Sequence, residues 1–102
     1  MNPASLANSA QRDVIAAAGW IARDNPAAAD AFLDAIDRAG KLIGDHPGIG
    51  TVHRELARAE YRFLGLTGFP YIVVYTTRRG LPVIARVIHT ARDLPRLLRD
   101  LQ

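Results

Sequence analysis

The sequence predicts a single α+β domain, with two helices first, three strands next and a short helix last. Apolar residues in the first half recur every three or four positions, which is the spacing of one helical face. After residue 60 the pattern changes to runs of β-branched and aromatic residues separated by glycine and proline, which is typical of strands and turns. With 102 residues, the chain is long enough to bury about 65% of its unfolded surface. We therefore expect an N-terminal helical hairpin packed on one face of an antiparallel sheet of three to four strands.

The first helix is expected to begin at Asn8 or Ser9, either of which can cap it, and to continue to about Asp24. Asn25 and Pro26 then predict a stop and a restart, because asparagine is a favourable cap and proline is tolerated in the first helical turn. The apolar stripe of the second helix contains Phe32, Ile36, Ala39 and Ile43. Two helices with almost no linker form an αα-hairpin.

Three strands are expected, over residues 61–68, 71–77 and 83–90. The middle strand is apolar on both faces, as expected at the centre of a sheet. Residues 3–7 are too short to assign but could add an edge strand. A short final helix begins at about Asp93, with leucines on one side and arginines on the other. In this arrangement the helical hairpin covers one face of the sheet and leaves the other at least partly open.

Several classes of protein are disfavoured by what the sequence lacks. There is no cysteine, so neither a disulfide framework nor a thiolate site is expected. No apolar run approaches the roughly 20 residues of a membrane span, and the start of the chain does not resemble a signal peptide. Asp45, His46 and His53 make no recognised metal site, because the histidines are far apart and flanked by glycines. We expect a cytoplasmic protein with no metal, no cofactor and no small-molecule substrate.

The two halves of the chain differ in charge. Residues 1–50 hold four basic groups against six aspartates, a net charge of −2, whereas residues 51–102 hold nine arginines against four acidic groups, a net charge of +5. Arginine is suited to bidentate pairing with carboxylates or phosphates. The basic half is either a binding surface or a set of solubilising and salt-bridging groups.

Four short motifs carry a family resemblance. They lie in Asn25–Ala29 at the start of the second helix, His46–Gly50 in the following turn, Phe69–Tyr75 on the central strand and Arg86–Leu94 at the last strand. Their order and spacing resemble the RelE/ParE family of type II toxin–antitoxin toxins, closest to the ParE branch. Members of that family usually begin with a clear strand, whereas residues 3–7 offer only a short one.

The resemblance implies a toxin that a cognate antitoxin, encoded beside it, holds inactive. The ParE-like branch is associated with poisoning of DNA gyrase and with ParD-like antitoxins, whereas the RelE-like branch cleaves mRNA in the ribosome. The resemblance therefore implies a non-enzymatic gyrase poison, with a ribosome-dependent mRNA endonuclease as the alternative. A toxin fold that has lost its toxicity is a third possibility.

The sequence favours the non-enzymatic branch. Attack of a 2′-hydroxyl on phosphate needs a base, an acid and cations around the phosphate. In a nuclease, Arg62, Arg86 and His89 would supply these groups. The family's strand motif has a second arginine where residues 64–66 are Leu-Gly-Leu, and Ile72 stands where the nuclease branch often has arginine. The expected phosphate pocket is therefore short of cations, although catalytic and structural roles remain equally open for Arg62.

Structural roles are the favoured alternatives for the other two candidates. Alternation places Arg86 on a strand face with Ile84 and Ile88, where burial of its charge calls for a carboxylate or several carbonyls. His89 is expected to tie the last strand to the final helix, with Asp93 or a backbone carbonyl as its partner.

Two binding surfaces are expected. Trp20, Phe32 and Leu33 are predicted to border a groove for the antitoxin, because tight interfaces use aromatic anchors; the alternative is that Trp20 is part of the core. A cationic stripe on the final helix, available to the target, is predicted to contain Arg92, Arg96 and Arg99. The alternative for the stripe is a solvated helix face.

Overall fold

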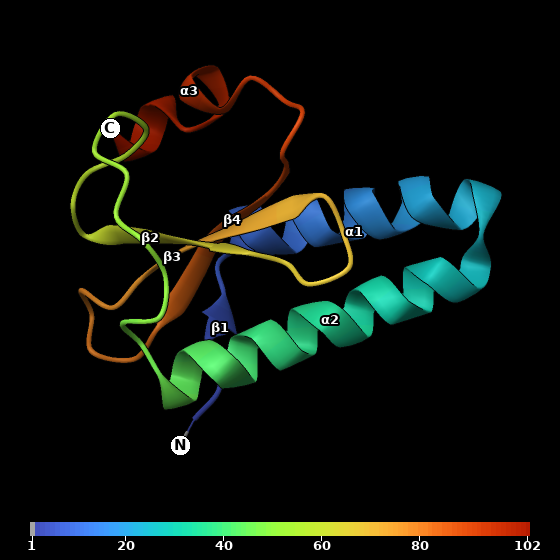
Figure 1. The fold of residues 1–102 in the computed structure, drawn as a ribbon, viewed down its shortest axis with the longest axis horizontal. Helices are drawn as coiled ribbons and strands as arrows, with labels where there is room; N and C mark the ends of the chain where they lie inside the picture. Colours follow the sequence, from blue (N-terminus) through green and yellow to red (C-terminus); the bar gives the residue numbers. More distant parts are fainter. Residues whose placement is uncertain (1) are drawn as a thin grey trace.

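The computed structural model describes residues 2–102 and confirms the α+β class, with an N-terminal helical hairpin on one face of a sheet (Figure 1). The elements in chain order are β1 (Ser5–Leu6), α1 (Asn8–Asp24), α2 (Pro26–Asp45), β2 (Tyr61–Gly65), β3 (Tyr71–Thr76), β4 (Val83–His89), α3 (Leu94–Leu97) and the 3-10 turn η1 (Arg99–Leu101). In Figure 1, α3 and the C-terminus lie across the sheet from α2. The sheet is therefore the middle layer of the molecule.

The strand order is β1-β4-β3-β2, and the pairs β2–β3 and β3–β4 are antiparallel as predicted. The short segment at the start of the chain does form an edge strand, β1, but it runs parallel to β4. The sheet is thus mixed rather than purely antiparallel. Parallel neighbours need a long connection, and here both helices and two further strands separate β1 from β4 in the chain.

The hairpin turn between the helices follows the sequence prediction. The Asn25 side chain accepts a hydrogen bond from the Ala28 backbone N–H (3.1 Å), and Pro26 begins α2. The predicted cap of α1 is wrong, because Ala7 is the cap residue and makes no side-chain bond. Ser9 instead donates its hydroxyl to the Ala85 carbonyl on β4 (2.7 Å).

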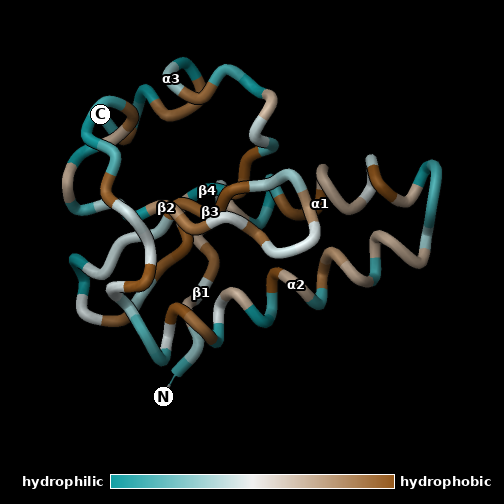
Figure 2. The backbone as a smooth tube through the Cα atoms, in the orientation of Figure 1, coloured by the Kyte–Doolittle hydropathy of each residue, from teal (hydrophilic) through white to brown (hydrophobic). Residues whose placement is uncertain are grey.

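The core between the hairpin and the sheet is centred on aromatic rings. Phe32 packs edge-on against Phe69 (5.4 Å between centroids) and tilted against Tyr71 (5.0 Å). All four residues of the predicted apolar stripe of α2 are buried. Hydrophobic and hydrophilic residues alternate along α2 in Figure 2, as expected for a helix with one buried face.

The other face of the sheet is more closed than the sequence predicts. Val74 and Ile88 on this face are buried beneath Leu98 and Leu101 of the C-terminal segment and Ala57 of the loop before β2. These residues form a second apolar core, because the final turns present their leucines to the sheet rather than to solvent.

A β-bulge in β4 corrects one strand-face prediction. Val74 pairs with Arg86 whereas the next residue, Tyr75, pairs with Ile84, so Ala85 is an extra residue in β4. Because side chains alternate along a strand, the extra residue moves Ile84 into the helix-side core. Arg86 therefore does not share a face with Ile84.

The hydroxyl of Tyr75 fixes the turn after α2. It donates to the Pro47 carbonyl (2.6 Å) and accepts from the Gly50 backbone N–H (2.9 Å), while its ring is fully buried. A Cβ at Gly50 would lie 2.8 Å from Cε1 of the Tyr75 ring, so glycine is needed for this close approach.

We expect Tyr75→Phe to lower the free energy of unfolding by about 1–2 kcal/mol, because the buried Gly50 N–H and the part-buried Pro47 carbonyl lose their partner. Urea titration followed by circular dichroism measures the change. The matched control is Tyr61→Phe, since the Tyr61 hydroxyl accepts only a long bond from Arg58 (3.4 Å) near the surface. Equal effects of the two substitutions would contradict this role for Tyr75.

Candidate functional site

A groove of about 600 Å³ lies between α1 and the C-terminal end of β4. We call it the α1–β4 groove. Its lining includes Asp13, Trp20, Arg86, His89, Arg92 and Leu97. The structure thus brings together residues that the sequence assigned to three different functions: catalysis, antitoxin binding and target binding.

The groove contains a bidentate ion pair. Arg86 donates from Nε to Oδ2 of Asp13 (2.7 Å) and from Nη2 to Oδ1 (3.2 Å). The Val87 backbone N–H also donates to Asp13 Oδ2 (2.9 Å), and Arg86 Nη1 donates to the Leu97 carbonyl (2.9 Å). The hydrogen bond to Asp13 raises the pKa of the Arg86 guanidinium above its usual range. The predicted salt bridge of Arg86 is confirmed, and its carboxylate partner is on α1.

Side chains of α1 also protect the outer edge of β4. β1 covers this edge only opposite Val83 and Ile84. Farther along, the Ala85 carbonyl accepts from Ser9 and the Val87 N–H donates to Asp13, one helical turn later. Unpaired edge groups invite pairing with another chain, so α1 takes the place of a further edge strand. This fixes α1, and with it one wall of the groove, against β4.

His89 is held locally rather than by the final helix. Its Nδ1 accepts from the Ala91 backbone N–H (3.0 Å), and its ring packs edge-on against Tyr71 (5.1 Å). The predicted partners are wrong, because Asp93 instead caps α3 by accepting from the Arg96 N–H (3.4 Å). Within residues 2–102, Nε2 of His89 makes no hydrogen bond.

Arg62 lies apart from the groove. Its Nη1 donates to the Gly50 carbonyl (2.8 Å) and, at 3.5 Å, to the Gly48 carbonyl. It therefore fastens β2 to the turn after α2. The three residues of the nuclease hypothesis are not assembled in one place, because only Arg86 and His89 line the groove.

The residues predicted to bind the antitoxin separate in the structure. Trp20 is 66% exposed, so the alternative that it belongs to the core is wrong. The Arg23 guanidinium lies 5.2 Å from the centroid of its ring. Leu33 is exposed but lines a different groove, of about 260 Å³, between the two helices and β1. Phe32 is fully buried and cannot border a surface groove, because its position falls on the inward stripe of α2.

The arginines predicted to bind the target are exposed but do not form a stripe on one helix. α3 has only four residues, so Arg92 precedes it in a bend and Arg99 follows it in η1, while Arg96 is on α3 itself. Within residues 2–102, the three side chains make no hydrogen bond or ion pair. Their guanidinium groups are therefore free to meet a partner.

A second cationic cluster was not identified from sequence. Arg58 and Arg78 donate to the same oxygen of Glu60, at 3.1 and 3.4 Å. Both bonds lower the pKa of the Glu60 carboxyl, and the bond from Arg58 has the larger effect. The Arg78-Arg79 pair in the turn after β3 could have revealed the cluster. Because β3 runs antiparallel to β2, this turn lies beside the start of β2, next to Glu60.

The described part of the chain holds neither a metal-binding cluster nor a helix suited to cross a membrane. Among residues 2–102, no group of three or more histidine, aspartate or glutamate side chains is placed to hold a metal ion. His53 instead pairs with Glu55 (3.1 Å) and packs edge-on against Phe63. No helix in the same range is both long and apolar enough to cross a membrane.

The fold and its surface define a class of protein. It is a small α+β domain with apolar residues on both faces of its sheet, a groove lined by aromatic residues, and exposed arginines whose side chains make no bond within residues 2–102. Residues 4–94 match the family model of the ParE toxin of type II toxin–antitoxin systems (parDE), and the chain belongs to this family. The resemblance predicted from sequence is confirmed. The protein is thus a toxin of a type II toxin–antitoxin system, which implies a cognate antitoxin as partner. The sequence has no significant match among curated proteins.

We expect Asp13→Ala to lower the free energy of unfolding by about 2–3 kcal/mol, because Arg86 and the Val87 N–H lose their shared, largely buried acceptor. The control is Asp37→Ala, which breaks an exposed i,i+4 pair with Lys41 (3.0 Å) and should cost less than about 0.5 kcal/mol. Urea denaturation of both variants measures the difference. Similar midpoints for the two variants would show that the Asp13 pair has no special role in the fold.

Proposed function

We propose that this toxin acts in the cytoplasm by poisoning DNA gyrase, through binding rather than catalysis, and that a ParD-like antitoxin neutralises it. Membership of the ParE toxin family supports the target and the partner. The non-catalytic mode of action is supported by the way in which the fold uses its cations.

The main support for this proposal is that the two arginines of the nuclease hypothesis, Arg62 and Arg86, form hydrogen bonds within the fold. Arg86 uses three guanidinium donors on Asp13 and Leu97, and Arg62 donates to the carbonyls of the turn after α2. Cations that stabilise a phosphoryl transition state must face the phosphate. The side chains of Arg92, Arg96 and Arg99 make no such bonds within residues 2–102, so they are available to a target surface.

The second candidate function is a RelE-like, ribosome-dependent mRNA endonuclease. One observation favours it: His89 has an unoccupied Nε2 within the described chain and lines the same groove as Arg92. Histidine can serve as a general base or acid near neutral pH. The two functions predict different damage in cells, namely gyrase-dependent DNA breaks or mRNA cut at defined positions.

We expect induced expression of the wild type to produce DNA breaks that require gyrase and to leave mRNA uncut. Arg92→Ala/Arg96→Ala/Arg99→Ala should abolish these breaks and restore growth, because it removes three unpaired cations without touching a bond of the fold. Its binding to the antitoxin should fall by less than about threefold, well below the tenfold that corresponds to 1.4 kcal/mol.

The charge-matched control for this experiment is Arg12→Ala/Arg38→Ala/Arg54→Ala. These three arginines are also exposed and make no side-chain bonds within residues 2–102. This variant should remain toxic. Sequencing of mRNA ends alongside the break assay tests the alternative directly. Cleavage of mRNA that disappears in His89→Ala would establish the endonuclease instead.

For the antitoxin, we propose the α1–β4 groove as the docking surface with Trp20 as its anchor. Trp20→Ala should weaken binding of the antitoxin at least thirtyfold, as for a central aromatic of an interface, with little change in thermal stability because the ring is 66% exposed. Isothermal titration calorimetry measures the affinity. The matched control is Ile15→Ala, since Ile15 is 72% exposed on the same helix but does not line the groove. Unchanged emission of Trp20 on saturation with a tryptophan-free antitoxin would remove the groove from consideration.

A further inference from the structure

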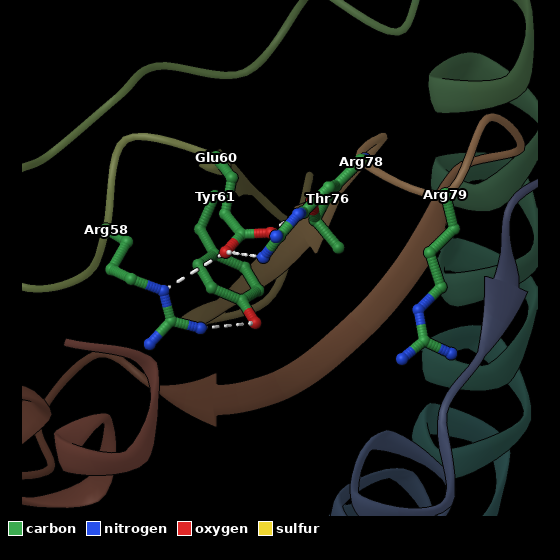
Figure 3. Close-up of a pocket in the computed structure, with 6 residues that line it drawn as sticks. All are labelled: Arg58, Glu60, Tyr61, Thr76, Arg78 and Arg79. Atoms are coloured by element: carbon green, nitrogen blue, oxygen red, sulfur yellow. Dashed lines mark hydrogen bonds and ion pairs between the residues drawn. The ribbon is translucent and has the colours of Figure 1, made fainter.

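A third cavity, of about 460 Å³, lies at the opposite end of β3 from His89, between the start of β2 and the β3–β4 turn (Figure 3). We call it the arginine cavity. Its lining consists of Arg58, Glu60, Tyr61, Thr76, Arg78 and Arg79. With three guanidinium groups around one carboxylate, the lining carries a surplus of positive charge that no described residue neutralises.

Glu60 organises two of the three guanidinium groups. Its Oε1 accepts from Arg58 Nε (3.1 Å) and from Arg78 Nη1 (3.4 Å), and Figure 3 shows both arginines directed at this oxygen. Arg58 also donates to the Tyr61 hydroxyl (3.4 Å), lies 5.4 Å from the centroid of the Tyr61 ring and donates to the Gln102 carbonyl (3.0 Å). Arg58 is thereby held in one orientation, which lowers the entropy lost when a ligand binds.

The third guanidinium group comes from the β3–β4 turn. Gly80 has a φ of +95° and donates its N–H to the Thr77 carbonyl (2.9 Å), which closes the turn that carries Arg78 and Arg79. Arg78 is 73% exposed, and the Arg79 side chain makes no hydrogen bond or ion pair within residues 2–102. In Figure 3, Arg79 lies on the far side of the cavity from Arg58, so the cations surround the opening.

We propose that the arginine cavity binds phosphate groups of double-stranded DNA. Guanidinium groups pair bidentately with phosphate, and a polar cavity with surplus positive charge attracts a polyanion. Arginines on a protruding turn can follow the backbone of a duplex, while Arg58, whose guanidinium is bonded within the fold, adds positive charge to the cavity. The choice of DNA over RNA rests on the proposed gyrase target, since gyrase holds DNA.

The cavity also adjoins the segment that carries other unpaired cations. The Arg58 N–H donates to the Leu101 carbonyl (2.8 Å), and its side chain reaches the following residue, Gln102. Arg96 and Arg99 lie in this same C-terminal segment. The arginine cavity therefore lies beside the C-terminal segment that carries these two arginines.

The first test measures DNA binding without gyrase, by fluorescence anisotropy of a labelled 20-base-pair duplex at about 50 mM salt, where phosphate contacts contribute most. Arg78→Ala/Arg79→Ala should weaken binding at least tenfold and reduce the slope of log K against log salt by about two units, one per lost phosphate contact. The charge-matched control, Arg38→Ala/Arg54→Ala, removes two exposed arginines elsewhere and should change the affinity less than threefold. Circular dichroism verifies the fold of each variant.

A second variant, Glu60→Gln, should strengthen DNA binding rather than weaken it. Glu60→Gln keeps an oxygen that can accept from Arg58 but removes the negative charge inside the cavity, so DNA should bind about threefold to tenfold more tightly. Glu55→Gln makes the same change in net charge beside His53, outside the cavity, and should leave the affinity unchanged within error. Equal effects of the two substitutions would overturn the assignment, because they would reflect net charge alone.

The remaining outcomes are also decisive. The proposal would be overturned if the wild type did not bind the duplex, or if the two double variants lost equal affinity. It would also be overturned if single-stranded RNA of the same sequence, or a poly-glutamate peptide, bound more tightly than the duplex. The assay contains no gyrase, so it is independent of toxicity. DNA binding that depends on Arg78 and Arg79, without gyrase-dependent breaks in cells, would support the cavity while contradicting the proposed function.

Discussion

The carboxylate of Asp13 connects three parts of the fold that are distant in sequence. It accepts two hydrogen bonds from Arg86 and one from the Val87 backbone, and Arg86 in turn reaches the Leu97 carbonyl. Without the carboxylate, a half-buried cation and a strand-edge N–H would both lose their partner, and each loss is costly away from water. Because α1 covers one face of the sheet and the C-terminal segment covers the other, this single group holds both apolar cores against the same strand.

The closed second face determines where charge can lie in this molecule. Val74 and Ile88 fill the middle of that face beneath Leu98 and Leu101, so a phosphate placed there would have to displace apolar side chains. The arginines are accordingly placed at the rims, in the bend before α3, in the C-terminal turns and in the arginine cavity. This distribution supports a toxin that meets its target with its periphery.

Local patterns in the sequence predict the elements well because each depends on near neighbours. The apolar run of β3, the Asn25–Pro26 cap and the inward stripe of α2 all appear where the periodicity places them. The partners of Ser9 and Asp13 are different, because these bonds join residues more than seventy positions apart. The bulge at Ala85 likewise depends on how β4 pairs with β3, which the pattern along one strand does not show. The same holds for the arginine cavity, which exists only because antiparallel pairing of β2 and β3 brings Glu60 beside Arg78. Sequence reasoning therefore finds strands and helices but not the side chains that meet across them.

The exposed ring of Trp20 is the strongest surface argument for a protein partner. A tryptophan that is 66% exposed leaves roughly 3 kcal/mol of burial free energy unused, at about 25 cal/mol per Å² over a large aromatic side chain. Beside it, the charge of Arg86 is already neutralised by Asp13, whereas Arg92 lines the same groove and makes no bond within residues 2–102. A segment that inserts an apolar side chain against Trp20 would bury the ring without disturbing the Asp13–Arg86 pair, and it would leave the Arg92 guanidinium available to the target. Burial of the Trp20 ring is therefore the requirement that a neutralising antitoxin would have to meet in this groove.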